Sequence, residues 1–408
     1  MLRRCYQARA ASGVDPRGAA MRVLLLYPYL PHPRVAHGSG RLVAALLDAW
    51  RARGVEVGLV CGYRDAERSE LEATARRVSW FHPVRRPLRA DLGVFGRVKE
   101  TVRTAWREAT TGRPRFVVKL DRAETRRAVR DALEATRYDL AQVELAGFAS
   151  YVDLLGGLPS ALIDHEAGAA SGDALATDPR ALRFVRDFYP RFGRVGALCE
   201  EDAADLGAAA PIAPFLRRPG THLPPGDGPA PERGRLLFFG SAEHAPNLDA
   251  LRRLAADLWP KIRARAPEAT LHVAAGPLGS DLESTLAAAG IGRLGFVADI
   301  AKEIRRASVI VAPLHKGRGV RIKNLEALAA GRALVTTTLG ARGLLIRSGV
   351  HAEIADSSDE FADAAARLAA APEIAARLGA AGREHVARTF THDAAADANV
   401  AVWRALLR

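Results

Sequence analysis

A strand, loop, helix, strand pattern between Val309 and Thr338 constrains the fold of this chain more than any other stretch. The parts are, in order, an apolar β-branched run, a glycine loop, a helix-like segment and a second apolar run: Val309–Val311, the loop with Gly317 and Gly319, Arg321–Ala330, and Ala333–Thr336. Gly331 follows the helix-like segment, as glycine does at many helix C-termini. Such a unit predicts a parallel α/β sheet. In these sheets, loops at the carboxyl ends of strands bind phosphorylated ligands, because backbone N–H groups of the next helix point outward there.

Two cations, Arg321 and Lys323, stand in the first turn of the predicted helix. Cations oppose the positive end of the helix dipole, so an anion held between them is a physical reason for the arrangement. Glu326 follows three residues after Lys323 and therefore shares its helical face. Its carboxylate could accept hydrogen bonds from two hydroxyls, as a ribose diol offers. A solvated helix with an ordinary Lys-Glu pair is the alternative interpretation.

Together with Leu236–Leu254, this stretch resembles the C-terminal half of the family 4 retaining glycosyltransferases, which have the GT-B fold and use nucleotide-activated sugars. The similarity runs in order from about Val23 to the C-terminus and is strongest over Leu236–Leu368. The resemblance implies an α/β protein with two Rossmann-like domains facing a cleft and a C-terminal helix that crosses back to the N-terminal domain.

The same resemblance implies roles for individual residues. Arg321 and Lys323 would bind the donor diphosphate and act in catalysis, and Glu326 would bind the ribose. The other donor-binding residues that it implies are Gly38, Gly40, Gly240, Ser241, Phe296, Gly319, Gly340 and Gly343. The backbone amides around the last two are expected to close over the donor sugar. No cofactor and no metal are expected, since the nucleotide sugar is a substrate and the sequence holds no Asp-x-Asp motif.

Two departures from the family pattern matter for this assignment. The family often carries two glutamates eight positions apart, and the first would fall at Arg318, which is basic. In many relatives the loop at Gly240 holds an Arg and a Lys that clamp the diphosphate, and neither is at the matching place here. Arg321 and Lys323 are therefore expected to carry more of that charge. Both departures favour the alternative of a catalytically inactive glycosyltransferase-like subunit.

A short glycine motif, Gly38-Ser39-Gly40, precedes the apolar-periodic helix predicted over Arg41–Arg53. The third glycine of a dinucleotide-binding fingerprint would fall at Val43, so the fingerprint is incomplete. A flexible turn is the plain interpretation. In the resembled family the matching loop faces the cleft and approaches the donor phosphates or the acceptor.

Asp164-His165-Glu166 follows a buried strand predicted over Ala161–Ile163. The triplet resembles the Asp/His position after the same strand in the glycosyltransferase family. His165 is therefore a candidate catalytic residue that contacts the reacting sugar or the acceptor, with Asp164 or Glu166 orienting it. The alternative is a turn held by local side-chain hydrogen bonds.

The length of 408 residues predicts two domains. Pro and Gly are concentrated in Arg217–Arg233, which marks a linker. The boundaries expected are 1–20 for a disordered extension, 21–216 for the N-terminal acceptor domain, 217–234 for the linker, 235–390 for the donor domain and 391–408 for the crossing helix.

The formal net charge of +13 predicts attraction to anions, such as nucleotides, phosphorylated substrates, an anionic membrane or nucleic acid. No aromatic-interleaved basic run and no zinc or helix-turn-helix signature supports nucleic acid. The three cysteines, Cys5, Cys61 and Cys199, lack metal-ligand spacing and indicate a reducing cytosol. No apolar run is long enough for a spanning helix, so a cytoplasmic protein is expected.

A basic amphipathic region begins near Leu88 and continues through Lys99. Such a surface could lie on an anionic membrane at the inner face, with Phe95, Leu92 and Trp106 inserted. The favoured interpretation is a core-facing helix with a solvated back.

These features together predict a glycosyltransferase that moves a sugar from a nucleotide-sugar donor to a hydroxyl acceptor, with retention of configuration. The acceptor class stays open between a glycan, a lipid-linked acceptor and a small molecule. The alternatives are the inactive subunit and, from the net charge, an anion-binding or nucleic-acid-binding protein.

Overall fold

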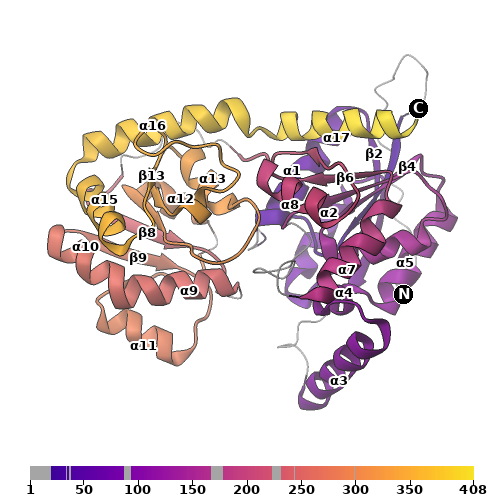
Figure 1. Ribbon diagram of the computed structural model, residues 1–408, viewed down its shortest axis with the longest axis horizontal. Helices are drawn as coiled ribbons and strands as arrows, with labels where there is room; N and C mark the ends of the chain where they lie inside the picture. The colour runs from indigo at the N-terminus through magenta and orange to yellow at the C-terminus, as the bar shows by residue number, and fades with distance from the viewer. Residues whose placement is uncertain are drawn as a thin grey trace. The chain divides into compact units, whose positions relative to one another are not determined.

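The computed structural model describes residues 20–33, 35, 38–86, 93–166, 178–222, 231–242, 244–297 and 299–408. These residues form two compact α/β units (Figure 1). The N-terminal unit is made mainly of Ser39–Arg218 and His392–Arg408, and the C-terminal unit mainly of Pro219–Thr391. Nearly all of the predicted extension, the middle of the predicted linker and the start of the amphipathic region with Leu92 lie outside the described residues.

The N-terminal unit is built on a seven-stranded parallel sheet in the order β3-β2-β1-β4-β5-β6-β7. Its strands are β1 (Arg22–Tyr27), β2 (Glu56–Tyr63), β3 (Trp80–Arg85), β4 (Leu140–Glu144), β5 (Ser160–Asp164), β6 (Arg194–Ala197) and β7 (Phe215–Leu216). β1 is apolar after Arg22, and every residue of β4 is buried, because helices cover both faces of the sheet. The strand order changes direction between β1 and β4, which is where open α/β sheets place their ligands.

Two layers of helices cover this sheet. They comprise α1 (Gly38–Ala52), α2 (Leu71–Ala75), α4 (Arg115–Leu120), α5 (Ala123–Ala135), α7 (Pro179–Phe188), α8 (Glu200–Ala209) and α17 (His392–Leu406), with 3₁₀ segments at Asp65–Glu70, Ala146–Leu154 and Tyr189–Arg191. Helix α3 (Val94–Thr111) packs beside α4 and projects from the unit (Figure 1). One apolar layer joins α1 to α17, where the rings of Trp50 and Trp403 lie 5.1 Å apart. The last helix of the chain therefore belongs to the N-terminal unit, as predicted.

The C-terminal unit has a six-stranded parallel sheet in the order β10-β9-β8-β11-β12-β13. Its strands are β8 (Arg235–Phe239), β9 (Thr270–Ala274), β10 (Gly292–Arg293), β11 (Val309–Ala312), β12 (Ala333–Thr336) and β13 (Glu353–Ile354). Its helices are α9 (Ala245–Arg253), a π-helical turn (Leu254–Leu258), α10 (Trp259–Arg265), α11 (Ser280–Ala288), α12 (Ile300–Arg306), α13 (Ile322–Ala329), α14 (Thr338–Ala341), α15 (Ser358–Ala370) and α16 (Pro372–Thr389). The order of strands changes direction between β8 and β11.

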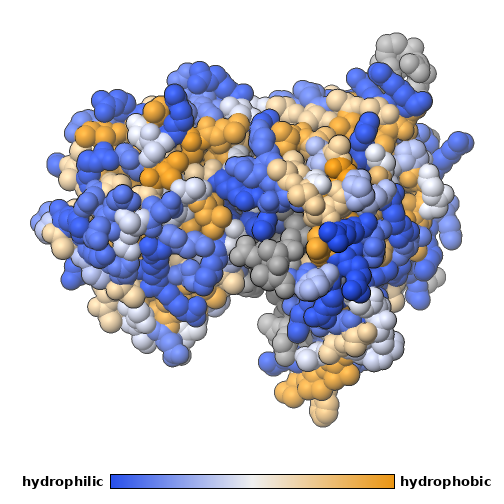
Figure 2. All heavy atoms as spheres, viewed as in Figure 1, coloured by the Kyte–Doolittle hydropathy of each residue, from blue (hydrophilic) through white to orange (hydrophobic). Residues whose placement is uncertain are grey.

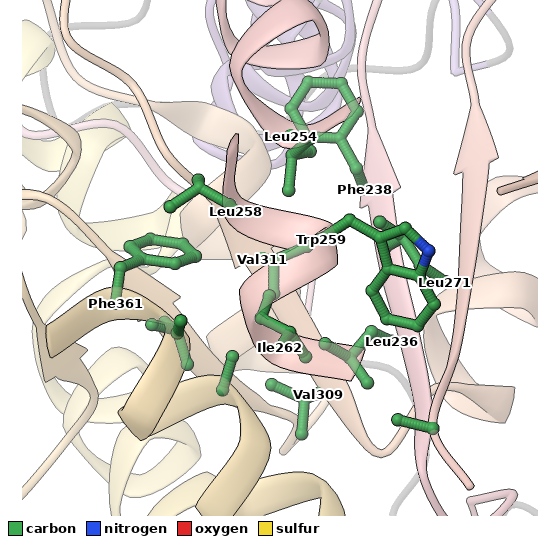
Figure 3. Close-up of a cluster of buried hydrophobic side chains, with 14 of the residues drawn as sticks. Leu236, Phe238, Leu254, Leu258, Trp259, Ile262, Leu271, Val309, Val311 and Phe361 are labelled. Atoms are coloured by element: carbon green, nitrogen blue, oxygen red, sulfur yellow. The ribbon is translucent and has the colours of Figure 1, made fainter. Parts of the chain in front are cut away.

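The core of the C-terminal unit lies between its sheet and the helices α9, α10 and α15. Figure 3 shows Trp259 and Ile262 of α10 among the strand residues Leu236 and Val309, with Phe361 of α15 on the other side. All five side chains are buried. This packing fixes the position of β8 and β11, whose carboxyl ends lead to the candidate site.

Three details differ from the sequence-based expectations. The predicted core-facing helix is wrong: α3 exposes Val94, Phe95 and Trp106 and buries Thr104. The glycine motif at Gly38 lies within the first turn of α1 rather than before the helix. The apolar pattern predicts a strand near Leu294–Phe296, but the edge strand β10 (Gly292–Arg293) ends before it, because Gly295, at φ 66°, turns the chain away.

Of the helices that the structure describes, none has both the length and the apolar content needed to span a bilayer.

Candidate active site

The loop between β11 and α13 folds around the guanidinium of Arg321. Gly317 and Gly319 have φ values of 96° and 78°, which side chains rarely adopt. Arg321 donates from Nη1 to the carbonyl of Arg318 at 2.7 Å and from Nη2 to that of Lys316 at 3.3 Å. A Cβ on Gly317 would lie 2.9 Å from Nη2 of Arg321. The glycine is therefore needed for this arginine to sit at the start of α13.

Lys323, in the first turn of α13, is held by neutral groups. Its Nζ donates to Oδ1 of Asn247 at 2.8 Å and lies 4.3 Å from the centre of the Phe238 ring. Burial, and secondly the charge of Arg321, lower the pKa of Lys323 to about 7. Because neither contact is with an anion, the ammonium gains charge compensation only from a ligand or by losing its proton.

Asn247 connects the loop after β8 to α13. Its Nδ2 donates to the carbonyl of Ser241 at 2.8 Å, while its Oδ1 accepts from Lys323. A Cβ on Gly240 would lie 2.7 Å from the same Nδ2, so glycine permits this close approach. Asn247 thus links Ser241, and the adjacent Gly240, to Lys323.

His244 occupies the N-cap position of α9, and its side chain makes no capping hydrogen bond. Burial, and then the charges of Arg321 and Lys323, lower its pKa to about 4. The imidazole is therefore neutral at neutral pH and belongs to the same electropositive cluster. Sequence interpretation did not select His244 or Asn247 as site residues. The available signal was their place in the loop and first turn of the helix that follows β8.

Beyond Lys323, α13 is joined to the segment that follows β12. Nδ2 of Asn324 donates to the carbonyl of Gly340 at 2.9 Å and to Oγ1 of Thr336 at 3.2 Å. Glu326 is half-buried one turn after Lys323 on the same helix. These contacts place α13 and α14 side by side.

The interpretation of Gly340 needs correction. Its backbone N–H donates to Oγ1 of Thr337 at 3.0 Å, so this amide is already used as a helix cap and does not face a ligand oxygen. A Cβ at Gly340 would lie 2.1 Å from Oγ1 of Thr336. Glycine is thus required there for packing. Gly343 has a φ of 71° in the turn after α14.

Phe296 stands apart from this cluster. It follows the edge strand β10, which β9 separates from β8, and its side chain is 68% exposed. An exposed aromatic ring at this edge could stack on a planar ligand.

The N-terminal unit holds a second polar cluster, centred on Glu144 at the carboxyl end of β4. Nε2 of His165, just after β5, lies 2.5 Å from Oε2 of Glu144. Arg217, just after β7, donates to both carboxylate oxygens, at 2.8 and 3.0 Å. Burial alone would raise the pKa of Glu144, but Arg217 and then His165 lower it, so Glu144 is ionised. A carboxylate only accepts, so Nε2 of His165 carries the hydrogen that Glu144 accepts, and Nδ1 is the other ring nitrogen.

This geometry corrects the expected partner of His165. Its orienting carboxylate is Glu144, not Asp164 or Glu166. Oδ2 of Asp164 accepts from the hydroxyl of Tyr189 at 2.6 Å, and Oδ1 accepts from the backbone N–H of Glu166 at 2.9 Å. The Asp164 carboxylate therefore caps the turn in which His165 lies.

The Glu144 cluster continues to the C-terminal helix. Nε2 of Gln142 donates to Oε1 of Glu144 at 2.6 Å. Oε1 of Gln142 accepts from Nδ2 of Asn399 at 2.9 Å and from Nε1 of Trp403 at 2.7 Å, both on α17. These four side chains and His165 are all buried. A continuous chain of hydrogen bonds thus joins α17 to His165.

The glycines of the N-terminal motif lie in the first turn of α1. Between them, Oγ of Ser39 accepts from the hydroxyl of Tyr27, at the end of β1, at 3.1 Å. Gly38 and Gly40 are therefore held at the carboxyl end of β1, next to the point where the strand order changes. Within the described parts of the chain, no group of three or more His, Cys, Asp or Glu side chains has the arrangement of a metal site.

Residues 233–371, about a third of the chain, match the family described as "Glycosyl transferases group 1". The match lies in the C-terminal unit and includes β8, α9, β11 and α13, which carry Asn247, Arg321 and Lys323.

Among curated proteins, the chain is 31% identical over 215 residues to D-inositol 3-phosphate glycosyltransferase from Streptomyces griseus, covering 45% of this chain and 44% of that protein. It is also 31% identical over 207 residues to the protein of the same name from Frankia alni, covering 44% of this chain and 50% of the relative. The chain thus spans about half the length of the curated relatives it matches.

Solved structures cover nearly the whole chain. Sucrose-phosphate synthase from Thermosynechococcus elongatus has a TM-score of 0.69 at 17% identity, over 94% of this chain and 99% of that one. Anabaena HepE in complex with UDP and glucose also has a TM-score of 0.69, at 13% identity, over 94% and 100% of the two chains. Both units of this chain have parallel, Rossmann-like sheets. Together with the likeness to these two structures, this confirms the predicted GT-B fold class.

Proposed function

We propose that this protein is a family 4 glycosyltransferase, which transfers a sugar from a nucleotide-sugar donor to a hydroxyl acceptor with retention of configuration. The observation that carries the proposal is the pair Arg321 and Lys323 at the N-terminus of α13. Lys323 is held there by the neutral groups of Asn247 and Phe238. A diphosphate would give Lys323 the anionic partner that neither Asn247 nor Phe238 provides.

The proposed chemistry is electrostatic. The bond between the anomeric carbon and the diphosphate breaks, a bond to the acceptor oxygen forms, and negative charge develops on the leaving diphosphate. Arg321, Lys323 and the N-terminus of α13 stabilise that charge. These groups would carry the charge that a metal ion carries in other transferases, so the proposal needs no metal.

The other assignments in the C-terminal unit concern the nucleoside and the sugar. Glu326 accepts hydrogen bonds from the ribose hydroxyls, and Phe296 stacks on the base. Gly240, Ser241 and Gly319 let the backbone approach the phosphates. The turn at Gly343 contributes to the sugar pocket.

In the N-terminal unit, we assign His165 the contact with the reacting sugar or the acceptor hydroxyl. Because Nε2 contacts Glu144, Nδ1 is the ring nitrogen assigned to the hydroxyl of the sugar or the acceptor. Gly38 and Gly40, at the start of α1, are also assigned to the surroundings of the reacting sugar or the acceptor hydroxyl. The proposal places the protein in the cytoplasm, in the synthesis of a polysaccharide or another cell-envelope component.

The test is calorimetric titration of the whole protein with UDP, GDP and ADP. One nucleotide should bind, and Lys323→Ala and Glu326→Ala should each weaken binding at least tenfold. Lys316→Ala is the matched control, because Lys316 lies in the same loop but its Nζ pairs with Asp249 at the surface. The control should bind like the wild type.

Absence of binding to all three nucleotides would contradict the proposal. Nucleotide binding without consumption of any nucleotide sugar would favour the inactive subunit that Arg318 suggests. Binding to mixed-sequence DNA with a steep salt dependence, and without competition by nucleotides, would favour the nucleic-acid alternative.

A further inference from the structure

Helix α3 of the N-terminal unit exposes a continuous apolar face. Four of its residues recur at intervals of four and a fifth adjoins the first: Val94, Val98, Val102, Trp106 and Phe95. At about 100° per residue, these side chains fall within about one third of the helix circumference. Phe95 is 92% exposed and Trp106 is 65% exposed. Figure 2 shows this α3 apolar face as a hydrophobic patch at the end of the N-terminal unit.

The opposite side of α3 is polar and holds the helix to the rest of the unit. Nη2 of Arg107 donates to Oδ2 of the buried Asp121 at 2.9 Å, and Oε1 of Glu100 accepts from Nη2 of Arg122 at 2.8 Å. Thr104, between them, is buried. A surface helix normally packs its apolar side inward and leaves its polar side in water. In α3 the two sides are exchanged, so packing against the parts of the chain that the structure describes does not explain the exposed apolar residues.

The shape of this face does not suit a peptide or helix partner. The shallow apolar hollow along it is lined by residues of α3 alone. Partner helices dock into grooves formed between several elements, whereas a single projecting helix presents a ridge. A ridge can sink into the headgroup layer of a bilayer.

The charges next to the α3 apolar face are complementary to an anionic surface. Both acidic residues of the helix face the protein: Glu100 contacts Arg122, and Glu108 contacts Arg115. Lys99 is exposed beside the apolar residues. The chain as a whole has a net charge of +13. Aromatic and aliphatic residues on one side with cations along the border are the features of helices that lie in a membrane interface.

We propose that the α3 apolar face inserts into the headgroup region of an anionic phospholipid membrane. The helix lies parallel to the membrane plane, Phe95 and Trp106 enter at its two ends, and Lys99 pairs with lipid phosphates. The glycosyltransferase assignment is not needed for this inference. If both hold, the acceptor hydroxyl is on a molecule at the membrane surface.

The first measurement is flotation with unilamellar vesicles of phosphatidylglycerol and phosphatidylcholine, compared with phosphatidylcholine alone. The wild type should float with the anionic vesicles and be released by high salt. Tryptophan emission should shift to the blue on binding. Trp106 is expected to be the main source, since Trp50, Trp259 and Trp403 are buried already and Trp80, in β3, is half-buried against Tyr138. Trp106→Phe should still float but lose most of the shift.

Paired variants test the face itself. The double variant Phe95→Ser and Trp106→Ser should bind anionic vesicles at least tenfold more weakly. Lys99→Glu should also weaken this binding. The matched control is Val350→Ser with Leu407→Ser, which removes two exposed apolar side chains elsewhere and should float like the wild type. Circular dichroism spectra and thermal unfolding like those of the wild type would show that all variants fold.

Three results would overturn the inference. The wild type fails to float with anionic vesicles; it floats equally well without Phe95 and Trp106; or it forms a dimer that the double variant dissociates, which would assign the α3 apolar face to a second copy. Vesicle binding and nucleotide binding are separate readouts, so either proposal can fail alone.

Discussion

At Lys323, burial and then the neighbouring Arg321 lower the ammonium pKa to about 7. A bound diphosphate favours the charged form and raises this pKa again, so above pH 7 binding takes up a proton. We predict that affinity for a nucleoside diphosphate is greatest below pH 7 and falls between pH 7 and 9, by up to about tenfold per unit. Calorimetry across this range, in buffers with different ionisation enthalpies, measures both the affinity and the proton uptake.

The control for this prediction is Lys323→Arg, because arginine stays charged throughout this range. Its affinity should vary little with pH. An equally flat profile for the wild type would contradict a partly neutral Lys323.

Single residues also show the limits of sequence interpretation. Arg321, Lys323 and His165 could be selected because each stands next to a strand or helix end that the local pattern predicts. Glu144 and Arg217 could not, since 73 positions separate them and only the parallel pairing of strands brings them together. Asn247 was missed for the same reason, as its partner Lys323 comes from another loop.

Among the elements, the loop from β11 to α13 depends on Gly317. Gly317→Ala adds a Cβ 2.9 Å from Nη2 of Arg321 at a φ of 96°. We predict a loss of about 1 kcal/mol of stability from the backbone alone and a fall of about tenfold in nucleotide affinity, because the guanidinium is displaced. Chemical denaturation and calorimetry measure the two effects.

Gly349→Ala separates these effects. Gly349 also has a positive φ, of 73°, but a Cβ there meets nothing within 4 Å. It should lose similar stability while nucleotide affinity is unchanged. Equal affinities in the two variants would show that the position of Arg321 does not depend on Gly317.

At the same scale, apolar runs predicted the buried strands and the glycine at position 331 marked the end of α13. Periodicity was less informative for α3, because it shows that a helix has an apolar side without showing what that side contacts. The short edge strand β10 was misplaced, since two residues carry little pattern. Gly340 was misassigned because a glycine needed for packing and one needed for a ligand look alike in sequence.

For the whole molecule, α17 is part of the N-terminal unit. We predict that Trp403→Ala destabilises that unit by about 3–5 kcal/mol, because the variant leaves a cavity beside Trp50 and removes a donor from buried Gln142. Thermal or urea unfolding measures the loss. Arg404→Ala, exposed on the same helix, should change stability by less than about 0.5 kcal/mol. Similar losses in both would contradict the role of Trp403.

The position of α17 in the N-terminal unit also affects the order in which the two units fold during translation. Chains generally fold domain by domain as they leave the ribosome. Here Trp50 and Gln142 emerge early, but Asn399 and Trp403, which complete their layer, are translated after the entire C-terminal unit. The N-terminal unit therefore starts to fold before the C-terminal unit but is completed after it, and until α17 has been translated the apolar side that α17 covers stays open to chaperones.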